Sequence, residues 1–436
     1  MNVAVIGTGY VGLTVACFAE FGHKVTLIGR DKRKIDMINR GESPIYEPGL
    51  DEILKRGVES GKLNATDDYS IVKKSDVVFI CVGTPSNEDG SIDLSQIKTS
   101  SGQIAEQLKT SNNFIVVVVK STVVPKTTVE VVKSILENVS GKKCGVDFGL
   151  AMNPEFLKEG TGVEDFIHPD KIAIGTFDER SYEILEKLYS CLNKKIPRIK
   201  SDTTTAEMIK YVQNSALASR ISFINEISNI CEKFSVDINE VSYAVGTDTR
   251  IGQKFLKAGP GFGGSCFPKD VKALLSAAKN SGENPLMLKA ILDVNAKQPY
   301  RMIDLAEKAV GDLKNKKVAV LGLAFKANTD DTRESPALVV VKELLKKGAK
   351  VTAYDPKAMD NAKETFGDDI KYASSKEECL KDADVCMILT EWDEFKNIVL
   401  AKIKCPIIDG RRIIDPEKAR KNGILYMGIG WKNNSR

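Results

Sequence analysis

Histidine is scarce in this 436-residue chain, which contains only His23 and His168. A zinc site with imidazole ligands, or a Ser-His-Asp triad, needs histidines that lie beside particular partners in the fold. Two histidines so far apart in the sequence argue against both arrangements. We therefore expect no metal site and no hydrolase of the triad type.

Long apolar runs and paired cysteines are also missing. The longest apolar runs, such as residues 114–119, are much shorter than the roughly 20 residues of a membrane-spanning helix, and the first residues lack the pattern of a signal peptide. The nine cysteines include no CxxC pair, and an odd number without a secretion signal favours reduced thiols. We expect a cytoplasmic protein with no membrane partner, in which every cysteine except Cys266 is a small buried apolar side chain.

A strong charge of one sign is absent as well. The net charge of +4 is small against 63 basic and 59 acidic side chains. It gives no basis for nucleic acid as a partner, although a local basic pocket for a phosphate is compatible with it. Hydrophobic residues make up 42% and charged residues 28%, which is ordinary for a globular protein of two or three domains.

The order of apolar and glycine-rich segments indicates an α/β protein. Residues 2–6 form a strand-like run, followed by a glycine turn, a helical pattern that ends at Gly22, and another strand-like run. Further strand-like runs alternate with helical patterns, which predicts a parallel, doubly wound sheet. Residues 203–234 contain no glycine or proline and predict one long helix. A second strand–glycine–helix–strand unit begins at Lys317.

These patterns predict three domains. We expect an N-terminal Rossmann-type domain over residues 1–200 and a central helical domain over residues 201–300. A second Rossmann-like domain should occupy residues 315–436.

The glycine turn near the start of the chain has the spacing Gly7-x-Gly9-x-x-Gly12. Glycine permits a tight turn and the close approach of a pyrophosphate, which the amides of the following helix can bind. In its strand–helix–strand setting the motif predicts a dinucleotide site rather than a turn that merely packs. The candidate residues are Gly7, Gly9, Tyr10, Val11 and Gly12.

The end of the second predicted strand departs from the usual dinucleotide-binding pattern. An Asp or Glu commonly binds the adenosine ribose hydroxyls there, but Gly29 and Arg30 stand at this position. Loss of the carboxylate removes repulsion toward a 2′-phosphate, and arginine can pair with that phosphate, which favours NADP. Alternatively, Asp31 takes over the ribose contact and the cofactor is NAD. Both cofactors stay open at this stage.

Two further loops, residues 82–85 and 120–123, follow predicted strands. Ligands bind at the carboxyl ends of parallel strands, so both loops should line the cofactor crevice. The candidate residues are Gly83, Thr84, Pro85 and Thr122.

The most informative segment is residues 259–270, with the sequence GPGFGGSCFPKD. Four glycines precede Cys266, and a helical pattern follows it. A thiol at a helix N-terminus beside Lys269 would be a better nucleophile, because both favour the thiolate. If Cys266 starts the helix, Asp270 lies one turn away on the same face. Composition alone is equally compatible with a glycine-rich loop that holds a buried cysteine.

This segment resembles the active-site motif of the UDP-glucose 6-dehydrogenase family, within the UDP-glucose/GDP-mannose dehydrogenases. The similarity extends over residues 1 to about 415 and includes, in order, residues 7–12, 43–49, 82–85, 120–123, 153–160, 168–170, 250–252 and 326–335. It implies a Rossmann domain, a helical middle and a C-terminal UDP-binding domain. It also implies two successive oxidations of a nucleotide sugar to the uronic acid, with UDP-glucose favoured over GDP-mannose or a UDP-N-acetyl sugar.

The resemblance implies roles for individual side chains. Cys266 would form a thiohemiacetal and then a thioester with the substrate. Lys210 and Asn214, four residues apart on the long helix, would stabilise the oxyanion, and Asp270 and Thr122 would position water. Without the resemblance, Lys210 and Asn214 would be interpreted as a surface pair on an amphipathic helix.

Other residues would bind the ligands. Those implied for the substrate, besides Lys210, Asn214 and Cys266, are Glu155 (also expected near the reacting carbon), Phe156, Leu157, Lys158, Arg250, Phe255, Lys257, Phe262, Gly263, Phe325, Lys326 and Arg411 or Arg412. Those implied for the cofactor are Gly29, Arg30, Lys34, Thr122, Glu159 and Arg333. Arg250 matches an arginine that crosses from a neighbouring subunit, which implies a homodimer or a higher homo-oligomer through the central helix.

Two other classes of protein share parts of this pattern. A single-step dehydrogenase of 2-hydroxy acids or sugar phosphates could share the Rossmann parts but would not need Cys266. A non-catalytic nucleotide-binding protein would tend to have lost one of Cys266, Lys210, Asn214 or Asp270, and all four are present. The sequence therefore favours an NAD(P)-dependent nucleotide-sugar dehydrogenase.

Overall fold

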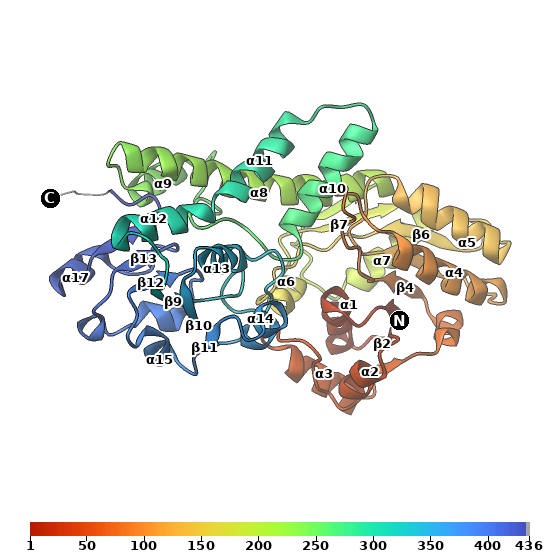
Figure 1. Ribbon diagram of the computed structural model, residues 1–436. Helices are drawn as coiled ribbons and strands as arrows, with labels where there is room; N and C mark the ends of the chain where they lie inside the picture. The colour runs from red at the N-terminus through yellow and green to blue at the C-terminus, as the bar shows by residue number, and fades with distance from the viewer. Residues whose placement is uncertain (433–436) are drawn as a thin grey trace. The chain divides into compact units, whose positions relative to one another are not determined.

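The computed structural model describes residues 1–432 and divides into two compact units, with the boundary between Gln213 and Asn214. Each unit contains one open β-sheet packed against helices (Figure 1). The predicted α/β class is therefore confirmed. Within residues 1–432, no helix combines the length and the apolar character needed to cross a membrane.

The first unit is built on an eight-stranded sheet with the order β3-β2-β1-β4-β5-β6-β7-β8. Its strands are β1 (Asn2–Ile6), β2 (Lys24–Ile28), β3 (Leu63–Thr66), β4 (Val77–Ile80), β5 (Val116–Val119), β6 (Gly149–Met152), β7 (Ile172–Thr176) and β8 (Arg198–Ser201). Its helical segments are α1 (Tyr10–Val15), η1 (Ala16–Phe21), α2 (Lys32–Asn39), α3 (Leu50–Glu59), η2 (Tyr69–Lys74), α4 (Ser95–Lys109), η3 (Thr127–Val132), α5 (Lys133–Ser140), α6 (Gly162–Ile167) and α7 (Glu179–Tyr189).

Alternation along the strands divides the core of this unit into two layers. In β1, Val3 and Val5 pack in one buried cluster with Leu13 of α1. Ala4 and Ile6 pack in a second cluster with Ile104 of α4. Successive side chains of a strand point to opposite faces, so a strand that is apolar throughout is covered by helices on both sides.

Two details of this unit differ from the prediction. The sheet is not parallel throughout, because β7 pairs antiparallel to β6, with Met152 opposite Gly175. The first helix also changes geometry, since the α-helix α1 ends at Val15 and continues as the 3₁₀ segment η1. Gly22 ends this segment as predicted, with a φ of 81° that favours glycine.

Helix α8 (Thr203–Lys233) ends one residue before the predicted end, and the boundary between the units falls inside it. In the second unit it is followed by α9 (Ile238–Gly246), α10 (Phe267–Asn280), α11 (Leu286–Lys297) and α12 (Tyr300–Val310). A small apolar cluster joins three of these helices to the glycine-rich loop, through Ala218, Phe262, Val271 and Ile291.

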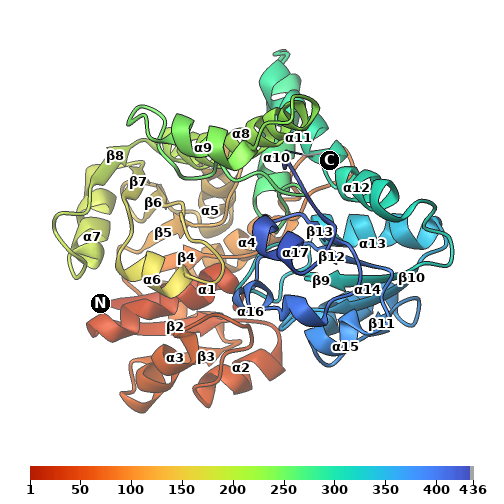
Figure 2. The same ribbon diagram turned by 90° about the vertical axis from the view of Figure 1, so that its left-hand side faces the viewer.

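The second sheet has the order β11-β10-β9-β12-β13-β14, and all of its strand pairs are parallel. Helices α12 and α13 lie on one of its faces and α15 on the other (Figures 1 and 2). The strands are β9 (Lys317–Leu321), β10 (Lys350–Tyr354), β11 (Lys371–Tyr372), β12 (Val385–Ile388), β13 (Ile407–Asp409) and β14 (Tyr426–Gly428). The remaining helical segments are α13 (Pro336–Lys346), α14 (Met359–Phe366), α15 (Lys376–Leu380), α16 (Asp393–Lys396), η4 (Leu400–Lys402) and α17 (Pro416–Lys421).

The nine cysteines are all free thiols. Seven are buried, as expected of small apolar side chains. Cys266 is partly exposed, and so is Cys191, for which the prediction was wrong. The thiol of Cys191 donates a hydrogen bond to the carbonyl of Leu188 at the end of α7.

Candidate active site

Two positions of the glycine turn between β1 and α1 admit only glycine. Gly7 has a φ of +118°, and a Cβ there would lie 2.5 Å from the carbonyl oxygen of Cys81. A Cβ on Gly12 would lie 2.0 Å from the carbonyl oxygen of Gly7. Gly9 faces open space and has no side chain to cap α1. The turn therefore fits the pyrophosphate of a dinucleotide, which needs close backbone approach.

The end of β2 has a glycine where a carboxylate commonly binds the ribose. Gly29 is buried against Thr8, and Arg30 is exposed. The Asp31 carboxylate caps α2 by accepting hydrogen bonds from the backbone N–H groups of Arg33 and Lys34. One oxygen of the Asp31 carboxylate, Oδ1, is thus engaged in stabilising the helix.

A buried carboxylate, Glu47, joins two of the motifs. It accepts a hydrogen bond from the hydroxyl of Tyr10 at 2.9 Å and others from the backbone N–H groups of Gly160 and Gly162 at 2.7 and 2.6 Å. Burial, and then the charge of Glu47, raise the pKa of Tyr10 above its usual range. Glu47 therefore fixes the loop that contains Lys158 against the start of α1.

Lys120 is buried beneath the ends of β5 and β6. Its Nζ donates to the side-chain oxygen of Asn153 at 3.0 Å and lies 5.7 Å from the ring centre of Phe79. The hydroxyl of Tyr189 also donates to Asn153, at 2.5 Å. Burial lowers the pKa of Lys120 to about 8.

Glu155 and Lys210 form a buried ion pair. The Nζ of Lys210 lies 2.9 Å from Oε1 of Glu155, and the side chains are 3% and 9% exposed, respectively. Burial by itself would raise the pKa of Glu155, but Lys210 and the backbone N–H of Leu157 outweigh it and lower the pKa. The ring of Phe156 lies below two ammonium groups, with Nζ of Lys171 at 4.2 Å and Nζ of Lys210 at 5.7 Å. These predicted residues are therefore brought together in the first unit.

The two loops after β4 and β5 are hydrogen-bonded to each other. The hydroxyl of Thr84 donates to the carbonyl of Thr122 at 3.0 Å, and the hydroxyl of Ser121 donates to the carbonyl of Val82 at 2.6 Å. Gly83 and Pro85 remain exposed. The arrangement agrees with the expectation that both loops lie at the same edge of the sheet.

Cys266 lies at the head of α10, as the sequence suggested. It is the N-cap residue, its carbonyl accepts a hydrogen bond from the N–H of Asp270, and its Sγ lies 3.5 Å from the hydroxyl of Ser265. Gly264 before it has a φ of +81°, and a Cβ there would lie 2.8 Å from the ring of Phe325. The glycines thus let the loop approach the second sheet closely.

Asp270 is almost fully buried one turn after the thiol. It accepts hydrogen bonds from Nδ2 of Asn214 at 2.6 Å and from Nζ of Lys269 at 2.5 Å. The ammonium of Lys269, which was expected beside the thiolate, pairs with the Asp270 carboxylate.

The predicted substrate residues of the second unit include a tight group around Arg411. Its Nη2 donates to the carbonyl of Phe325 at 3.0 Å, and its Nε lies 3.0 Å from Glu391. A Cβ on Gly259 would lie 3.3 Å from Nη1 of Arg411. Arg412, the alternative to Arg411, is instead held by Asp237 in a buried ion pair at 3.0 Å.

The other predicted residues of the second unit differ in their burial and contacts. Phe262 is buried, with its backbone bonded to Asn295, and a Cβ on Gly263 would lie 2.3 Å from the carbonyl of Glu334. Nζ of Lys326 lies 5.4 Å from the ring centre of Phe325, whereas Lys257 is exposed. Phe255 has a φ of 63° and packs on Phe267.

Three predicted basic residues lie in salt bridges at the surface. Arg250 pairs with Asp248 and Arg333 with Asp331, each at 2.6 Å, and their side chains are 86% and 65% exposed. In the first unit, Lys158 pairs with Asp165 at 2.6 Å. Of the remaining cofactor candidates, Lys34 and Glu159 are partly buried in the first unit.

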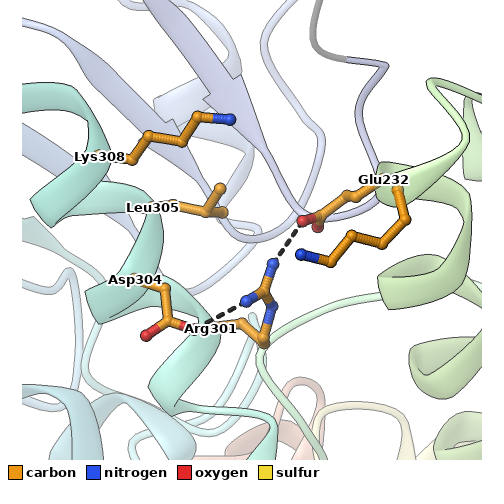
Figure 3. A pocket seen from close by; sticks show the side chains of 6 residues that line it. Glu232, Arg301, Asp304, Leu305 and Lys308 are labelled. Carbon is orange, nitrogen blue, oxygen red and sulfur yellow. Dashed lines mark hydrogen bonds and ion pairs between the residues drawn. The ribbon is translucent and has the colours of Figure 1, made fainter.

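A cavity of about 200 Å³ in the second unit contains none of the residues selected from the sequence. Figure 3 shows Arg301 in its centre, where the guanidinium is paired with Glu232 at 2.5 Å and Asp304 at 2.7 Å. Because its central charge is already neutralised, we assign no ligand to this cavity.

Sequence reasoning missed several buried polar residues that build the site. Glu47 and Asn153 lay inside the motifs that carried the resemblance, yet no role was expected for either. Lys120 was expected only as part of a loop. A charged residue next to a run of valines is the signal that could have singled out Lys120, because such a lysine is costly to bury without partners.

Three family models match this chain. They are the UDP-glucose/GDP-mannose dehydrogenase family NAD-binding domain over residues 1–193, the central domain over residues 204–297 and the UDP-binding domain over residues 319–416. The chain belongs to the UDP-glucose/GDP-mannose dehydrogenase family.

Curated relatives resemble the chain along its whole length. It is 46% identical to UDP-glucose 6-dehydrogenase AglM of Haloferax volcanii, over 98% of this chain and 100% of that protein. It is 43% identical to UDP-glucose 6-dehydrogenase YwqF of Bacillus subtilis, over 99% of this chain and 98% of that protein.

Solved structures agree with this assignment. A UDP-glucose dehydrogenase from Pyrobaculum islandicum, 38% identical, matches with a TM-score of 0.93 over 99% of this chain and 98% of that one. A UDP-D-ManNAc dehydrogenase from Pyrococcus horikoshii, 32% identical, matches with a TM-score of 0.88 over 99% of both chains.

Proposed function

We propose that this protein oxidises UDP-glucose twice at one carbon, to UDP-glucuronate, with a nicotinamide dinucleotide as the oxidant. The observation that carries the proposal is a partly exposed thiol, Cys266, at the head of α10 with a fixed carboxylate one turn behind it. The UDP-glucose 6-dehydrogenases named above support the choice of substrate. A single-step dehydrogenase would have no use for the thiol.

Cys266 makes the second oxidation possible. When bound, the nicotinamide ring accepts a hydride from the substrate carbon in each of the two oxidations. The thiolate adds to the carbonyl carbon of the aldehyde, and protonation of the resulting oxyanion gives a thiohemiacetal. Loss of hydride and of the hydroxyl proton converts this adduct to a thioester. Water then adds to the thioester carbon, the C–S bond breaks, and the acid and the thiol are released.

The neighbouring side chains hold charge and water in position. We assign stabilisation of the oxyanion to the ammonium of Lys210 and the amide of Asn214. Asp270, held by Asn214 and Lys269, would orient the water that attacks the thioester, with Thr122 as a second contact. Glu155 keeps the Lys210 ammonium in one place.

We propose that three segments of the chain have separate roles. Residues 1–200 would bind the dinucleotide, residues 201–300 would supply the thiol and the subunit interface, and residues 315–436 would bind the UDP moiety. Phe325, Lys326 and Arg411 are the proposed contacts to the nucleotide.

We further propose that the cofactor site accepts NADP as well as NAD. Gly29 leaves no carboxylate at the end of β2, Asp31 is occupied as a helix cap, and Arg30 is exposed beside this turn. A guanidinium there can pair with a 2′-phosphate, and no negative charge at position 29 repels it.

Titration of the protein with NADPH and NADH, followed by nicotinamide fluorescence, tests the cofactor proposal without turnover. Arg30→Ala should weaken NADPH binding about ten-fold and leave NADH binding nearly unchanged. Lys24→Ala, at the opposite end of β2, is the matched control. Equal effects of Arg30→Ala on both cofactors, or no NADPH binding by the wild type, would contradict the proposal.

We also propose a homodimer in which a second copy covers the C-terminal part of α8. Phe223 and Ile230 on this helix and Phe234 directly after it are 56%, 46% and 76% exposed, and Tyr243 of α9 is 68% exposed. Apolar side chains that are this exposed along one helix favour burial in a subunit interface. Arg250, on the loop after α9, is exposed and would reach the second copy.

Light scattering after gel filtration measures the oligomer. Phe223→Asp should shift the mass toward the monomer. Leu286→Asp, which changes a side chain on α11 that is 68% exposed, should not. A monomeric wild type would refute the dimer.

The experiment for the main proposal is the yield of reduced cofactor per molecule of UDP-glucose consumed. Two per sugar is expected. One per sugar would exclude the thioester route. Turnover of GDP-mannose or a UDP-N-acetyl sugar but not of UDP-glucose would keep the mechanism and replace the substrate.

A further inference from the structure

Glu207 is a buried carboxylate of α8 to which the proposed mechanism gives no role. Its Oε2 accepts a hydrogen bond from the backbone N–H of Lys126 at 2.6 Å. Its Oε1 accepts from the backbone N–H of Thr128 at 2.7 Å and from the hydroxyl of Thr128 at 2.6 Å. No surface of the side chain is exposed. Three donors thus converge on one carboxylate and bind the turn at residues 126–128 to the helix.

The turn that Glu207 holds has an unfavourable backbone conformation. Lys126 has a φ of 77°, in the left-handed region that a lysine rarely adopts. The π-helical segment η3, which is rare in proteins, starts directly after it. Such a conformation persists only where the surroundings determine it, and here the contact to the N–H of Lys126 comes from Glu207.

The clamped turn closes the loop that contains Thr122. The other end of this loop is fixed by Ser121, which donates to the carbonyl of Val82, and by Thr84, which donates to the carbonyl of Thr122. Glu207 precedes Lys210 by three residues, so the two side chains lie on the same side of α8. The carboxylate therefore links the loop that presents Thr122 to the helix that presents Lys210.

We propose that Glu207 is a positioning residue for the reaction, which fixes Thr122 relative to Lys210 by clamping the turn at Lys126 to α8. This inference rests on the roles proposed above for Thr122 and Lys210. Displacing a water-positioning group by about 1 Å can lower a rate a hundred-fold, so a clamp far from the reacting carbon has a measurable effect.

Glu207→Gln is the decisive substitution because it keeps the size of the side chain. An amide has only one accepting oxygen, and its NH₂ would face a backbone N–H that needs an acceptor. We expect kcat with UDP-glucose to fall about ten- to a hundred-fold, with KM for UDP-glucose and NADH affinity changed by less than about two-fold. Amide hydrogen exchange should become faster across residues 126–132.

Lys126→Gly in the Glu207→Gln background should restore kcat roughly ten-fold, because glycine adopts the left-handed turn without a clamp. Glu130→Gln is the matched control, since this carboxylate pairs only weakly with the side chain of Lys126, at 3.7 Å, and its loss should leave kcat unchanged. If Glu207→Gln does not fold, Thr128→Val removes a single donor and should give a smaller loss in kcat.

Wild-type kcat in Glu207→Gln, or unchanged exchange across residues 126–132, would overturn the proposal. A loss of kcat that Lys126→Gly does not relieve would also overturn it, because the carboxylate would then act in some way other than through the turn. Exchange is measured without turnover, so a wild type that oxidises no nucleotide sugar would contradict the proposed function alone.

Discussion

Lys210 donates a hydrogen bond from Nζ to Oε1 of Glu155 at 2.9 Å, and both side chains are almost completely buried. Two opposite charges in such a place stabilise each other, but each would be costly alone. The proposed cation for the oxyanion is therefore held by a carboxylate that cannot be removed without consequence.

Lys210→Ala should destabilise the first unit by about 3–5 kcal/mol, because it leaves a buried carboxylate without its partner. The double variant Lys210→Ala with Glu155→Gln should recover most of this loss, since no uncompensated charge remains. Urea unfolding of the wild type, both single variants and the double variant measures the difference. Additive losses in the double variant would show that the two residues are not coupled.

Cys266→Ser should abolish production of the acid while leaving binding of UDP-glucose intact. Serine is a much weaker nucleophile toward the aldehyde, so kcat should fall by roughly 10³-fold or more. Cys191→Ser, which changes the other partly exposed thiol, should retain wild-type kcat. Calorimetric titration with UDP-glucose and the yield of UDP-glucuronate separate binding from chemistry.

The stability of the protein should depend on pH through Lys120. Burial lowers its pKa from 10.5 to about 8, so between these values the unfolded chain binds more protons than the folded one. The contribution to stability is then fully present above pH 10.5 and is lost as the pH falls through 8, by about 3 kcal/mol in all.

Comparison of Lys120→Met with the wild type isolates this contribution from that of other groups. The unfolding free energy of the wild type, relative to the variant, should rise as the pH increases from 8 toward 10.5. Urea unfolding between pH 8 and pH 10.5 measures the unfolding free energy of the wild type and of the variant. Parallel curves would show that Lys120 keeps an ordinary pKa in the folded protein.

Removing the Glu47 carboxylate should loosen the loop at residues 158–162. Glu47→Ala leaves the N–H groups of Gly160 and Gly162 without their acceptor, at about 1–3 kcal/mol each where no water replaces it. Proteolysis of this loop should become faster. Tyr10→Phe, which removes a single hydroxyl donor and keeps both backbone bonds, should have a smaller effect. Equal protection in wild type and Glu47→Ala would contradict this role.

The predicted fold depended on features that act over a few residues. A left-handed glycine such as Gly22, the turn from Gly7 to Gly12, and uninterrupted helical periodicity over residues 203–233 are dictated by local sterics and hydrogen bonding. The reversal of β7 was not visible in the sequence. A buried strand has the same apolar pattern in either direction, and only the route of the connecting chain decides its orientation.

The sequence by itself determined the candidate thiol, through a glycine-rich loop before Cys266 and Asp270 one helical turn after it, and the motifs that carry the family resemblance. Only the tertiary structure decided which residues form ion pairs and hydrogen bonds with each other. Lys269 pairs with Asp270, Arg412 with Asp237, and Glu207 with the turn at Lys126. A buried charge takes whichever opposite charge or donor the packed chain brings within reach. That neighbour is adjacent in sequence for Lys269 but distant for Arg412 and Glu207.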